Sequence, residues 1–589
     1  MGLDAFIRAL GGAWWQAPTA LFLLVSASFG IGTLILPRGY DRFTRVALGV
    51  ALAALAGLLP HHLLPPWAEV LILLPFAGYG VWSLARRSVD IKASVVVIAA
   101  LWGAFALASA LLPPYVWDEQ VYQTALLVRH PGLPVLMDNP YSAYPLLPHF
   151  FLGWGGGIGG LYLPRLAIWG VTLLLGCKLW SHLAERPERR LEAAVLTLIV
   201  MLAPVSLVLQ RSFYAESFIA LFALAGWLVL GKTDADRRDF MLAGVFAGAC
   251  AAVKLTGVGA ALMLAVCALA GKRRFGWFLL GAAAVALPFY LRPFIVTGDP
   301  VYPYGALLFG GEARLMAAEF HRALGNYRYG LNGIPGAALG WIFCCFAEKV
   351  YDGVVCGFGV LAMTITLLVT VLLRRERKTY LEFAALLAGY LFWSFTSQQT
   401  RFVYPLLFPA ALLLAETFDV FPGRRERTAA AVVLFLAFCT ALPSAWPHLR
   451  HFSTAWRIMP MARRSPAEFL SPVDREYFAA LTVLDKIAPP NARVLLLFER
   501  RSLYVPRQAV HGTPCFQELR FTPPPTSAEQ LFSGLKDVDY ILLGDSRRGA
   551  DHLETYDDVE AAVRGQLAEL VRTGKVRIVA PWLFEVRHD

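Results

Sequence analysis

Two adjacent carboxylates, Asp118 and Glu119, stand just after an apolar stretch that ends near residue 112. Charged side chains are costly in lipid, so this pair belongs at a membrane–water boundary. Paired acids suit a general base with a helper group, or two ligands of a metal ion. In the structural alternative, Asp118 accepts backbone N–H bonds at the start of an amphipathic helix. Composition alone leaves both interpretations open.

Two further charged residues interrupt apolar sequence. Lys254 lies within the apolar run 251–257, where an unpaired charge is costly, and Glu216 precedes the apolar stretch 217–231. Glu216 is the natural second carboxylate of a site, and a local ion pair with Arg211 is its structural alternative. For Lys254 the alternative is that its ammonium group extends to the nearer interface.

The composition excludes a water-soluble protein. Of the 589 residues, 57% are apolar and 16% are charged, whereas soluble globular proteins have about 45–50% apolar and about 25% charged residues. The net charge is +11, but the cations stand in short clusters between apolar runs and form no continuous basic face, so no nucleic-acid partner is expected. We expect a polytopic α-helical protein of the lipid bilayer.

A helix needs about 20 apolar residues to cross the hydrocarbon layer. Windows of this kind occur at residues 18–37, 46–59, 68–85, 93–112, 161–180, 191–209, 217–231, 276–293, 354–373, 380–396, 402–418 and 428–446. The stretch 240–270 is too long for one span and is interrupted near Lys254, so it is interpreted as two short helices. The sequence thus predicts about fourteen transmembrane helices.

Clusters of Lys and Arg orient the predicted spans. They fall at residues 38–45, 86–92, 178–190, 232–238, 272–274, 374–378 and 424–427. All of them lie on one side if the spans alternate, and the positive-inside rule makes that side cytoplasmic. The opposite side then receives the outer loops 113–160 and 294–353 and the C-terminal tail.

The tail has the pattern of a small α/β unit. A helical periodicity from Tyr477 to Ile487 is followed by predicted strands at 493–498, 540–544, 576–579 and 583–586, with a helix at 559–572. The chain is therefore divided into an N-terminal extension with three spans (1–92), a transmembrane core (93–450), a linker (451–473) and an outer α/β domain (474–589). A stabilising cap is favoured for this domain over a lid or an acceptor-binding role.

The eight cysteines show no C-x-x-C spacing, and five lie in or beside predicted spans. Neither a zinc site nor a disulfide framework is indicated. Cys344 and Cys345 are adjacent in the outer loop 294–353. A bridge from this pair to a residue such as Cys356 is the less favoured alternative to free thiols.

An enzyme on the outer face has no nucleotide pool, so a synthetic reaction there needs a substrate activated before it crosses the membrane. Lipid-linked sugars meet this need, and the chain has neither a GxxxxGK[ST] loop nor a dinucleotide fingerprint. Sugar transfer requires a carboxylate to take the acceptor proton and cations to hold the departing phosphate. The candidate cations are Arg401, Lys254, Arg211 and Arg292, with Arg401 first because a guanidinium group binds phosphate in bidentate fashion.

Four segments, in this order, resemble the bacterial membrane glycosyltransferases of the GT-C superfamily, whose relatives include the protein O-mannosyltransferases and the lipid A aminoarabinose transferases. They are the Pro-Pro to Trp-Asp-Glu segment 113–119, Pro-Tyr to Tyr-Pro at 140–145, Gly-Asp-Pro-Val-Tyr-Pro at 298–303, and Gln-Thr-Arg-Phe-Val-Tyr-Pro at 399–405. The similarity covers the chain from about residue 93, and the first three spans resemble an extension.

The resemblance implies an inverting transfer from a polyprenyl-phosphate sugar. Asp118 occupies the position of the base, and Glu119 matches the second acid of the Asp-Glu pair in the O-mannosyltransferases. Many bacterial relatives carry Tyr-His shortly after the acid, whereas this chain has Tyr122-Gln123. His149 is the substitute imidazole, so a divalent cation (Mg²⁺ or Mn²⁺) is assigned to Glu119 and His149.

Tyrosines are dense in the predicted outer loops, and Tyr122 and Tyr144 stand beside the motifs above. Sugar faces stack on aromatic rings, which makes both residues candidates for substrate binding. An aromatic belt at the interface predicts the same enrichment.

The sequence therefore predicts a glycosyltransferase of the bacterial inner membrane, with its active site and α/β domain in the periplasm. Asp118 is the predicted base, Glu119 and Glu216 position the acceptor or a metal, and Arg401 and Lys254 hold the lipid phosphate. The acceptor is a lipid, a glycan or a protein. The alternatives are a transporter or flippase of lipid-linked sugars and a non-catalytic subunit of a glycan assembly complex.

Overall fold

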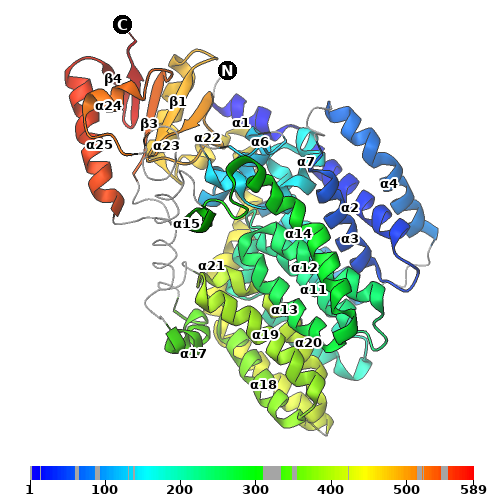
Figure 1. Cartoon of the computed structure of the whole chain (residues 1–589). Helices are drawn as coiled ribbons and strands as arrows, with labels where there is room; N and C mark the ends of the chain where they lie inside the picture. Colours follow the sequence, from blue (N-terminus) through cyan, green and yellow to red (C-terminus); the bar gives the residue numbers. More distant parts are fainter. Residues whose placement is uncertain are drawn as a thin grey trace.

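The computed structural model consists of a large helical bundle with a small sheet domain at one end (Figure 1). It describes the chain except residues 1–2, 14, 60–64, 87–92, 131, 137–138, 310–332, 348–353, 422, 514–520, 522, 546–554 and 589. Much of the predicted outer loop 294–353 and Cys515 lie outside the described residues.

The bundle is built from helices throughout its described length. It begins with α1 (Leu3–Gly11), α2 (Gln16–Ile35), α3 (Arg42–Ala56), α4 (Pro66–Arg86) and α5 (Ala93–Ala110). The middle part contains α6 (Thr124–Arg129), α7 (Leu147–Gly159), α8 (Leu163–Leu183), α9 (Arg190–Met201), α10 (Pro204–Gln210) and α11 (Glu216–Leu230). The last part contains α12 (Arg237–Val253), α13 (Val258–Ala268), α14 (Phe275–Thr297), α15 (Ala306–Phe309), α17 (Gly333–Cys344), α18 (Phe358–Arg374), α19 (Arg377–Phe395), α20 (Tyr404–Thr417) and α21 (Arg424–Arg464).

The predicted count of about fourteen spans is too high. By length and composition, six stretches of the described chain can cross a membrane, or seven if the bent pair α9–α10 is one span. Several predicted spans form shorter apolar helices instead, among them α11 and α18. The reason is that an apolar run marks burial as well as lipid contact, and most of α11 is buried among other helices.

The predicted break in the stretch 240–270 is confirmed. Lys254 has an extended backbone (φ −166°, ψ 156°) and separates α12 from a short 3₁₀ turn, Leu255–Gly257, and α13. A second break lies between α9 and α10, whose axes differ by 62°. A predicted site residue, Lys254, stands at the first break, and Arg211 follows the far end of the short helix α10 after the second.

The predicted linker at 451–473 is instead helical as far as Arg464, because α21 continues through residue 450. The apolar run ends near residue 446, but the helix still packs against protein beyond that point. Phe452 and Ala455 of α21 are both buried, in clusters that include Ala106 and Ala108 of α5.

Close helix pairs in the bundle cross at glycines. A Cβ atom on Gly30 of α2 would lie 2.0 Å from the carbonyl oxygen of Phe76, and one on Gly80 of α4 would lie 2.2 Å from that of Ser26. No side chain fits at these distances, so the two backbones touch directly. This is the small-residue packing by which membrane helices associate without a hydrophobic driving force.

The sheet domain has five strands in the order β2-β1-β3-β5-β4. They are β1 (Arg493–Leu497), β2 (Gln508–His511), β3 (Tyr540–Leu543), β4 (Val576–Ala580) and β5 (Leu583–Val586), with α22 (Pro466–Leu470), α23 (Arg475–Ile487), α24 (Ala528–Ser533) and α25 (Thr555–Arg572). β1 pairs in parallel with β2 and β3, while β5 pairs antiparallel with β3 and β4. The four predicted strands are confirmed. β2 is absent from the prediction because two of its four residues, Gln508 and His511, are polar.

The segment after β1 attaches this domain to the residues around the acid pair. Backbone N–H groups of Ser502 and Leu503 donate to the carbonyl of Gln120 at 3.1 and 3.2 Å. The hydroxyl of Tyr504 donates to the carbonyl of Pro114 at 2.7 Å. The sheet domain and the acid pair therefore lie at the same end of the bundle.

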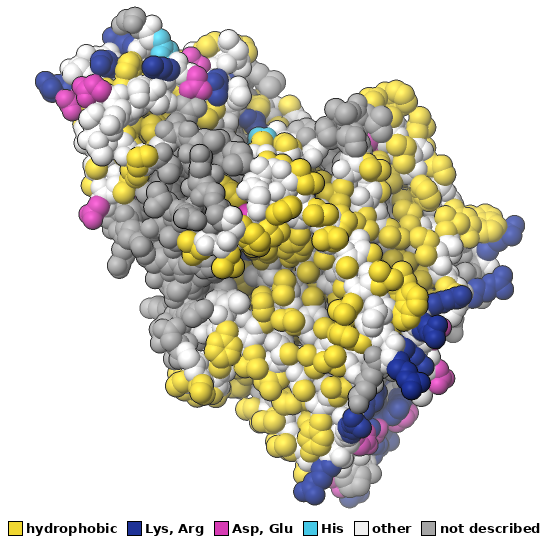
Figure 2. Space-filling model, viewed as in Figure 1, with side chains coloured by type: hydrophobic (Ala, Val, Ile, Leu, Met, Phe, Trp, Pro, Cys, Tyr) yellow, Lys and Arg dark blue, Asp and Glu magenta, His cyan; other side chains and the backbone are white. Residues whose placement is uncertain are grey.

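The surface shows the separation expected for a membrane protein. Hydrophobic side chains cover a broad band of the bundle, and Lys and Arg gather at the end opposite the sheet domain (Figure 2). This distribution agrees with the multi-pass arrangement of the helices.

The glycine packing can be tested within α4. Gly80→Ala should destabilise the protein by about 1–3 kcal/mol, because the new methyl group overlaps the backbone of α2. Gly78→Ala is the matched control, since no atom lies within 4 Å of the position of its Cβ. Thermal unfolding of the two purified variants in detergent provides the comparison, and equal midpoints would contradict direct backbone packing.

Candidate active site

The two predicted acids face different neighbours. Asp118 immediately precedes a π-helical turn, Glu119–Gln123, a feature frequent at functional sites. Successive side chains of a helix point in different directions, and the two acids have different partners in this structure. Asp118 does not cap the helix, because its side chain accepts no capping hydrogen bond. Glu119, in contrast, accepts a hydrogen bond from a backbone group: the N–H of Val116 donates to its Oε2 at 3.2 Å.

Asp118 forms an ion pair with the first predicted cation. Its Oδ2 lies 2.9 Å from Nη1 of Arg401, and the hydroxyl of Tyr122 donates to the same oxygen at 3.4 Å. The side chains of Asp118 and Arg401 keep 15% and 13% of their surface exposed. Both charges therefore keep a small accessible surface, unlike the fully buried pair described below.

Neighbouring groups fix the Arg401 guanidinium. Its Nε donates to Oε1 of Gln399 at 2.9 Å. Its carbon Cζ stands 4.8 Å from the ring centroid of Tyr214 and 5.3 Å from that of Phe402. This cation is held in a defined orientation by a polar partner and two aromatic rings.

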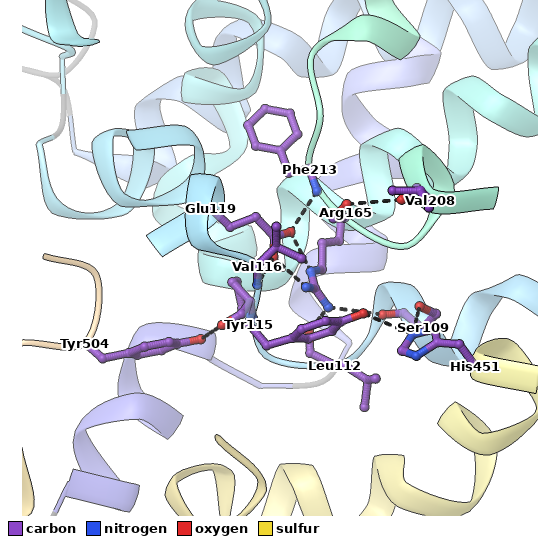
Figure 3. A network of polar contacts seen from close by, with 12 residues as sticks. Ser109, Leu112, Tyr115, Val116, Glu119, Arg165, Val208, Phe213, His451 and Tyr504 are labelled. Atoms are coloured by element: carbon purple, nitrogen blue, oxygen red, sulfur yellow. Dashed lines mark hydrogen bonds and ion pairs between the residues drawn. The ribbon is translucent and has the colours of Figure 1, made fainter. Parts of the chain in front are cut away.

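Glu119 is fully engaged in a buried ion pair that the sequence does not reveal (Figure 3). Its oxygens accept from Nε and Nη2 of Arg165 at 2.7 and 2.5 Å, and the backbone N–H of Phe213 donates to Oε1 at 2.7 Å. Both side chains are essentially inaccessible, with exposures of 0% for Glu119 and 1% for Arg165. Glu119 is thus directed at these internal partners and away from any substrate.

Arg165 reaches three more groups around the acid pair. Its Nη1 donates to the carbonyls of Leu112 and Ser109 at 3.3 and 3.5 Å, and its Cζ lies 4.4 Å from the ring centroid of Tyr115. In the sequence, Arg165 is recognisable only as an arginine directly after Leu163-Pro164, at the start of a predicted span. A cation at the end of a span is equally compatible with an orientation signal, so the sequence does not single it out.

Glu216 and Lys254 form a second, weaker pair. Lys254 Nζ lies 3.4 Å from Oε1 of Glu216 and 4.8 Å from the ring centroid of Phe402. Glu216 is completely buried, and among the described residues its Oε2 has no hydrogen-bond partner. The predicted alternative of a Glu216–Arg211 pair is wrong. The ring of Phe402 contacts both cations, Lys254 and Arg401.

Tyrosines gather beside Asp118. Tyr122 stacks on Tyr141 with centroids 4.5 Å apart, and Tyr144 meets both rings edge-on. The hydroxyls of Tyr144 and Tyr304 lie 2.8 Å apart. Burial, together with the charge of Asp118, raises the pKa of the Tyr122 hydroxyl well above its ordinary value, so this group keeps its proton and donates at neutral pH.

Two predicted phosphate-binding arginines have other partners. Arg292 donates to the backbone carbonyls of Leu133, Ser142 and Tyr144 at 2.8, 2.5 and 2.7 Å. It therefore holds the segment that carries the tyrosine cluster. Nη1 of Arg211 lies 3.3 Å from Nδ1 of His448 on α21.

The residues assigned to a divalent cation do not fit one. Glu119 is occupied by Arg165, and Nε2 of His149 lies 2.9 Å from the carbonyl of Gln123. Within the described part of the chain, no three His, Cys, Asp or Glu side chains gather in a way that could hold a metal ion.

A small pocket lies beside the ring of Phe402, which contacts both Lys254 and Arg401. Its other walls come mainly from α13, α19 and α20, and include Ala260, Phe392 and Leu406 as well as the polar residues Thr256, Thr396 and Ser397. Two cations that contact one aromatic ring suit an anionic group such as a phosphate.

The buried pair generates a stability prediction. Arg165→Met should cost about 3–5 kcal/mol of folding free energy, because it leaves the carboxylate of Glu119 buried without a counter-charge. The control is Arg572→Met, which breaks an exposed pair with Glu569 and should cost less than about 1 kcal/mol. Thermal unfolding in detergent distinguishes the two. The double change Glu119→Gln with Arg165→Met should recover part of the loss, and an Arg165→Met protein as stable as the wild type would contradict a structural role of the pair.

Comparisons with known proteins address the fold. A family model described as "Domain of unknown function (DUF8201)" matches residues 168–408, and no curated protein sequence matches the chain. Among solved structures, the apo form of ArnT from Cupriavidus metallidurans is similar, with 14% identity and a TM-score of 0.50. ArnT from the same organism bound to undecaprenyl phosphate has 13% identity and a TM-score of 0.49. Each alignment covers 84% of this chain and 97% of the other.

ArnT is a lipid A aminoarabinose transferase of the GT-C type. The alignment with the apo form therefore confirms the predicted resemblance at the level of the fold. The chain is a multi-pass helical membrane protein with the ArnT fold and a small mixed sheet at its C-terminal end.

Proposed function

We propose that the protein is an inverting glycosyltransferase that moves a sugar from a polyprenyl-phosphate carrier to an acceptor on the periplasmic face of the bacterial inner membrane. The observation that carries the proposal is the partly exposed pair of Asp118 and Arg401, with Oδ2 and Nη1 2.9 Å apart. It brings a proton acceptor and a phosphate-binding cation side by side in the ArnT fold.

The orientation rests on charge. Lys and Arg gather at the end of the bundle opposite the sheet domain (Figure 2). The positive-inside rule makes that end cytoplasmic. The sheet domain and Asp118, which lie together at the other end, are then periplasmic.

The proposed reaction is a single displacement at the anomeric carbon. Asp118 removes the proton from the acceptor hydroxyl, the acceptor oxygen forms a bond to that carbon, and the bond to the phosphate oxygen breaks on the opposite face. The configuration inverts because one displacement occurs. Arg401 and Lys254 bind the phosphate group as it leaves with its negative charge.

The two cations beside Phe402 support a donor with a phosphate group, because Lys254 and Arg401 both contact the ring of this residue. ArnT has been crystallised with undecaprenyl phosphate. A polyprenyl phosphate is the donor that we propose for this pair of cations.

The other predicted residues take supporting roles in this proposal. Glu119 orients Asp118 through the shared helical turn, and Glu216 holds Lys254 in place. Tyr122 donates to Asp118 and, with Tyr144, forms the aromatic wall on the acceptor side. A lipid, a glycan or a protein can present the hydroxyl group. No step is assigned to a metal ion.

The base is tested by transfer of labelled sugar from a synthetic polyprenyl-phosphate donor with purified protein. Asp118→Asn should lower kcat by about 10²- to 10⁴-fold, the contribution typical of general base catalysis. Asp537→Asn, in the sheet domain, is the control and should retain full turnover. Full turnover by Asp118→Asn would exclude this residue as the base, and counterflow of donor in proteoliposomes without a covalent product would favour the transporter alternative.

The role of Arg401 in phosphate binding is tested separately, by measuring the affinity of the purified protein for undecaprenyl phosphate. Arg401→Ala should weaken binding about tenfold or more, because a charge-assisted contact contributes about 1.5–3 kcal/mol. Asp118→Asn should bind at least as tightly as the wild type, because Arg401 then has no competing carboxylate. Arg273→Ala, which removes an exposed cation from the turn before α14, serves as the control. Equal affinities of Arg401→Ala and the wild type would remove Arg401 from the donor site.

A further inference from the structure

Three cysteine side chains meet at the connection between α17 and α18. Cys344 is the last residue of α17, Cys345 follows it, and Cys356 lies two residues before α18 begins. Each of the three thiols affects the pKa of the other two, because their sulfur atoms lie close together. Their exposures are 0%, 1% and 1%, and all three belong to the buried core of the bundle.

The backbone sets the two segments that carry these residues directly against each other. The N–H of Cys356 donates to the carbonyl of Cys344 at 2.9 Å, and that of Gly357 donates to the carbonyl of Cys345 at 3.0 Å. Bridged cysteines have Cα atoms about 4.4–6.8 Å apart. Backbones joined by direct hydrogen bonds are close enough that Cys356 can meet the adjacent pair without a large backbone movement.

The three thiols are not equivalent. The thiol of Cys344 donates to the carbonyl of Trp341 at 3.1 Å, which leaves Cys345 as the neighbour without a competing backbone acceptor in the described chain. Cys345 is therefore the favoured partner of Cys356.

We propose that Cys345 and Cys356 form a disulfide in the mature protein, with Cys344 as a third, unbridged thiol beside it. The oxidant is a periplasmic thiol–disulfide oxidoreductase that acts before the segment is buried. One of the two thiolates attacks the oxidant's disulfide and forms a mixed disulfide, and the other thiolate then attacks the sulfur of the first cysteine. The two electrons and the two thiol protons pass to the oxidant, which leaves in its dithiol form.

This proposal depends on the proposed function only for the side of the membrane, because disulfides persist in the periplasm and are rare in the cytoplasm. The bridge would secure a segment that supports the active site. The N–H of Val205, at the start of α10, donates to the carbonyl of Val355 at 3.0 Å. α10 leads to Phe213, whose backbone N–H donates to Glu119.

The test traps free thiols with N-ethylmaleimide as intact cells are lysed in denaturant, and quantifies them in the full-length protein by mass spectrometry under non-reducing conditions. We expect a cross-link between the peptides that contain Cys345 and Cys356, and alkylation at Cys344. Cys344→Ser and the control Cys439→Ser should retain the cross-link, whereas Cys345→Ser and Cys356→Ser should lose it. Dithiothreitol should lower the midpoint temperature of thermal unfolding of the wild type and leave that of the Cys356→Ser variant unchanged.

Alkylation of all three residues without prior reduction would overturn the proposal, and so would a bridge from Cys344. These outcomes are independent of sugar transfer. An active enzyme with three free thiols would refute the bridge alone, and a bridged protein without transferase activity would refute the proposed function alone.

Discussion

The buried ion pair of Glu119 and Arg165 is the interaction on which the arrangement of the site depends. Two charges removed from water are tolerated only with close partners and further hydrogen bonds. Here the carboxylate also accepts from the N–H groups of Val116 and Phe213, and the guanidinium also donates to the carbonyls of Ser109 and Leu112. The pair therefore joins the end of α5, the acid segment, α8 and the turn before α11, and so fixes the direction of Asp118.

The sheet domain reinforces the same segment from outside the bundle. Arg501 bonds to Glu499 and Asp474, and its Cζ lies 4.8 and 3.9 Å from the ring centroids of Trp117 and Tyr477. Burial opposes the charge of Arg501, but the two carboxylates raise the pKa of its guanidinium, which stays protonated. The contacts support the stabilising role that the sequence favours for this domain. Its attachment to Gln120 and Pro114 places it beside the acid pair without occupying Asp118.

The sequence is informative where a single residue conflicts with its surroundings. Asp118, Lys254 and Arg401 are charges in or beside apolar runs. In the structure, Arg401 pairs with Asp118 and contacts the rings of Tyr214 and Phe402, while Lys254, which pairs with Glu216, contacts the same Phe402 ring. The sequence is uninformative where the outcome depends on a distant partner. Nothing local distinguishes Arg165, which neutralises Glu119, from Arg292, which binds backbone carbonyls. The predicted number of spans is wrong for a related reason, since apolar sequence does not distinguish burial in protein from burial in lipid.

The pairing of Asp118 with Arg401 has a chemical consequence for the proposed transferase. The predicted base and the predicted phosphate-binding group form an ion pair, with 2.9 Å between Asp118 Oδ2 and Arg401 Nη1. In the proposed reaction, a donor phosphate that binds Arg401 would compete with this carboxylate, and Asp118 would then be free to accept a proton from the acceptor. Lys254 contacts the same Phe402 ring and pairs with Glu216, so it would add a second positive contact without disturbing Asp118. Donor binding and activation of the base would thereby be coupled through the guanidinium group of Arg401, whose position is set by Gln399 and Tyr214.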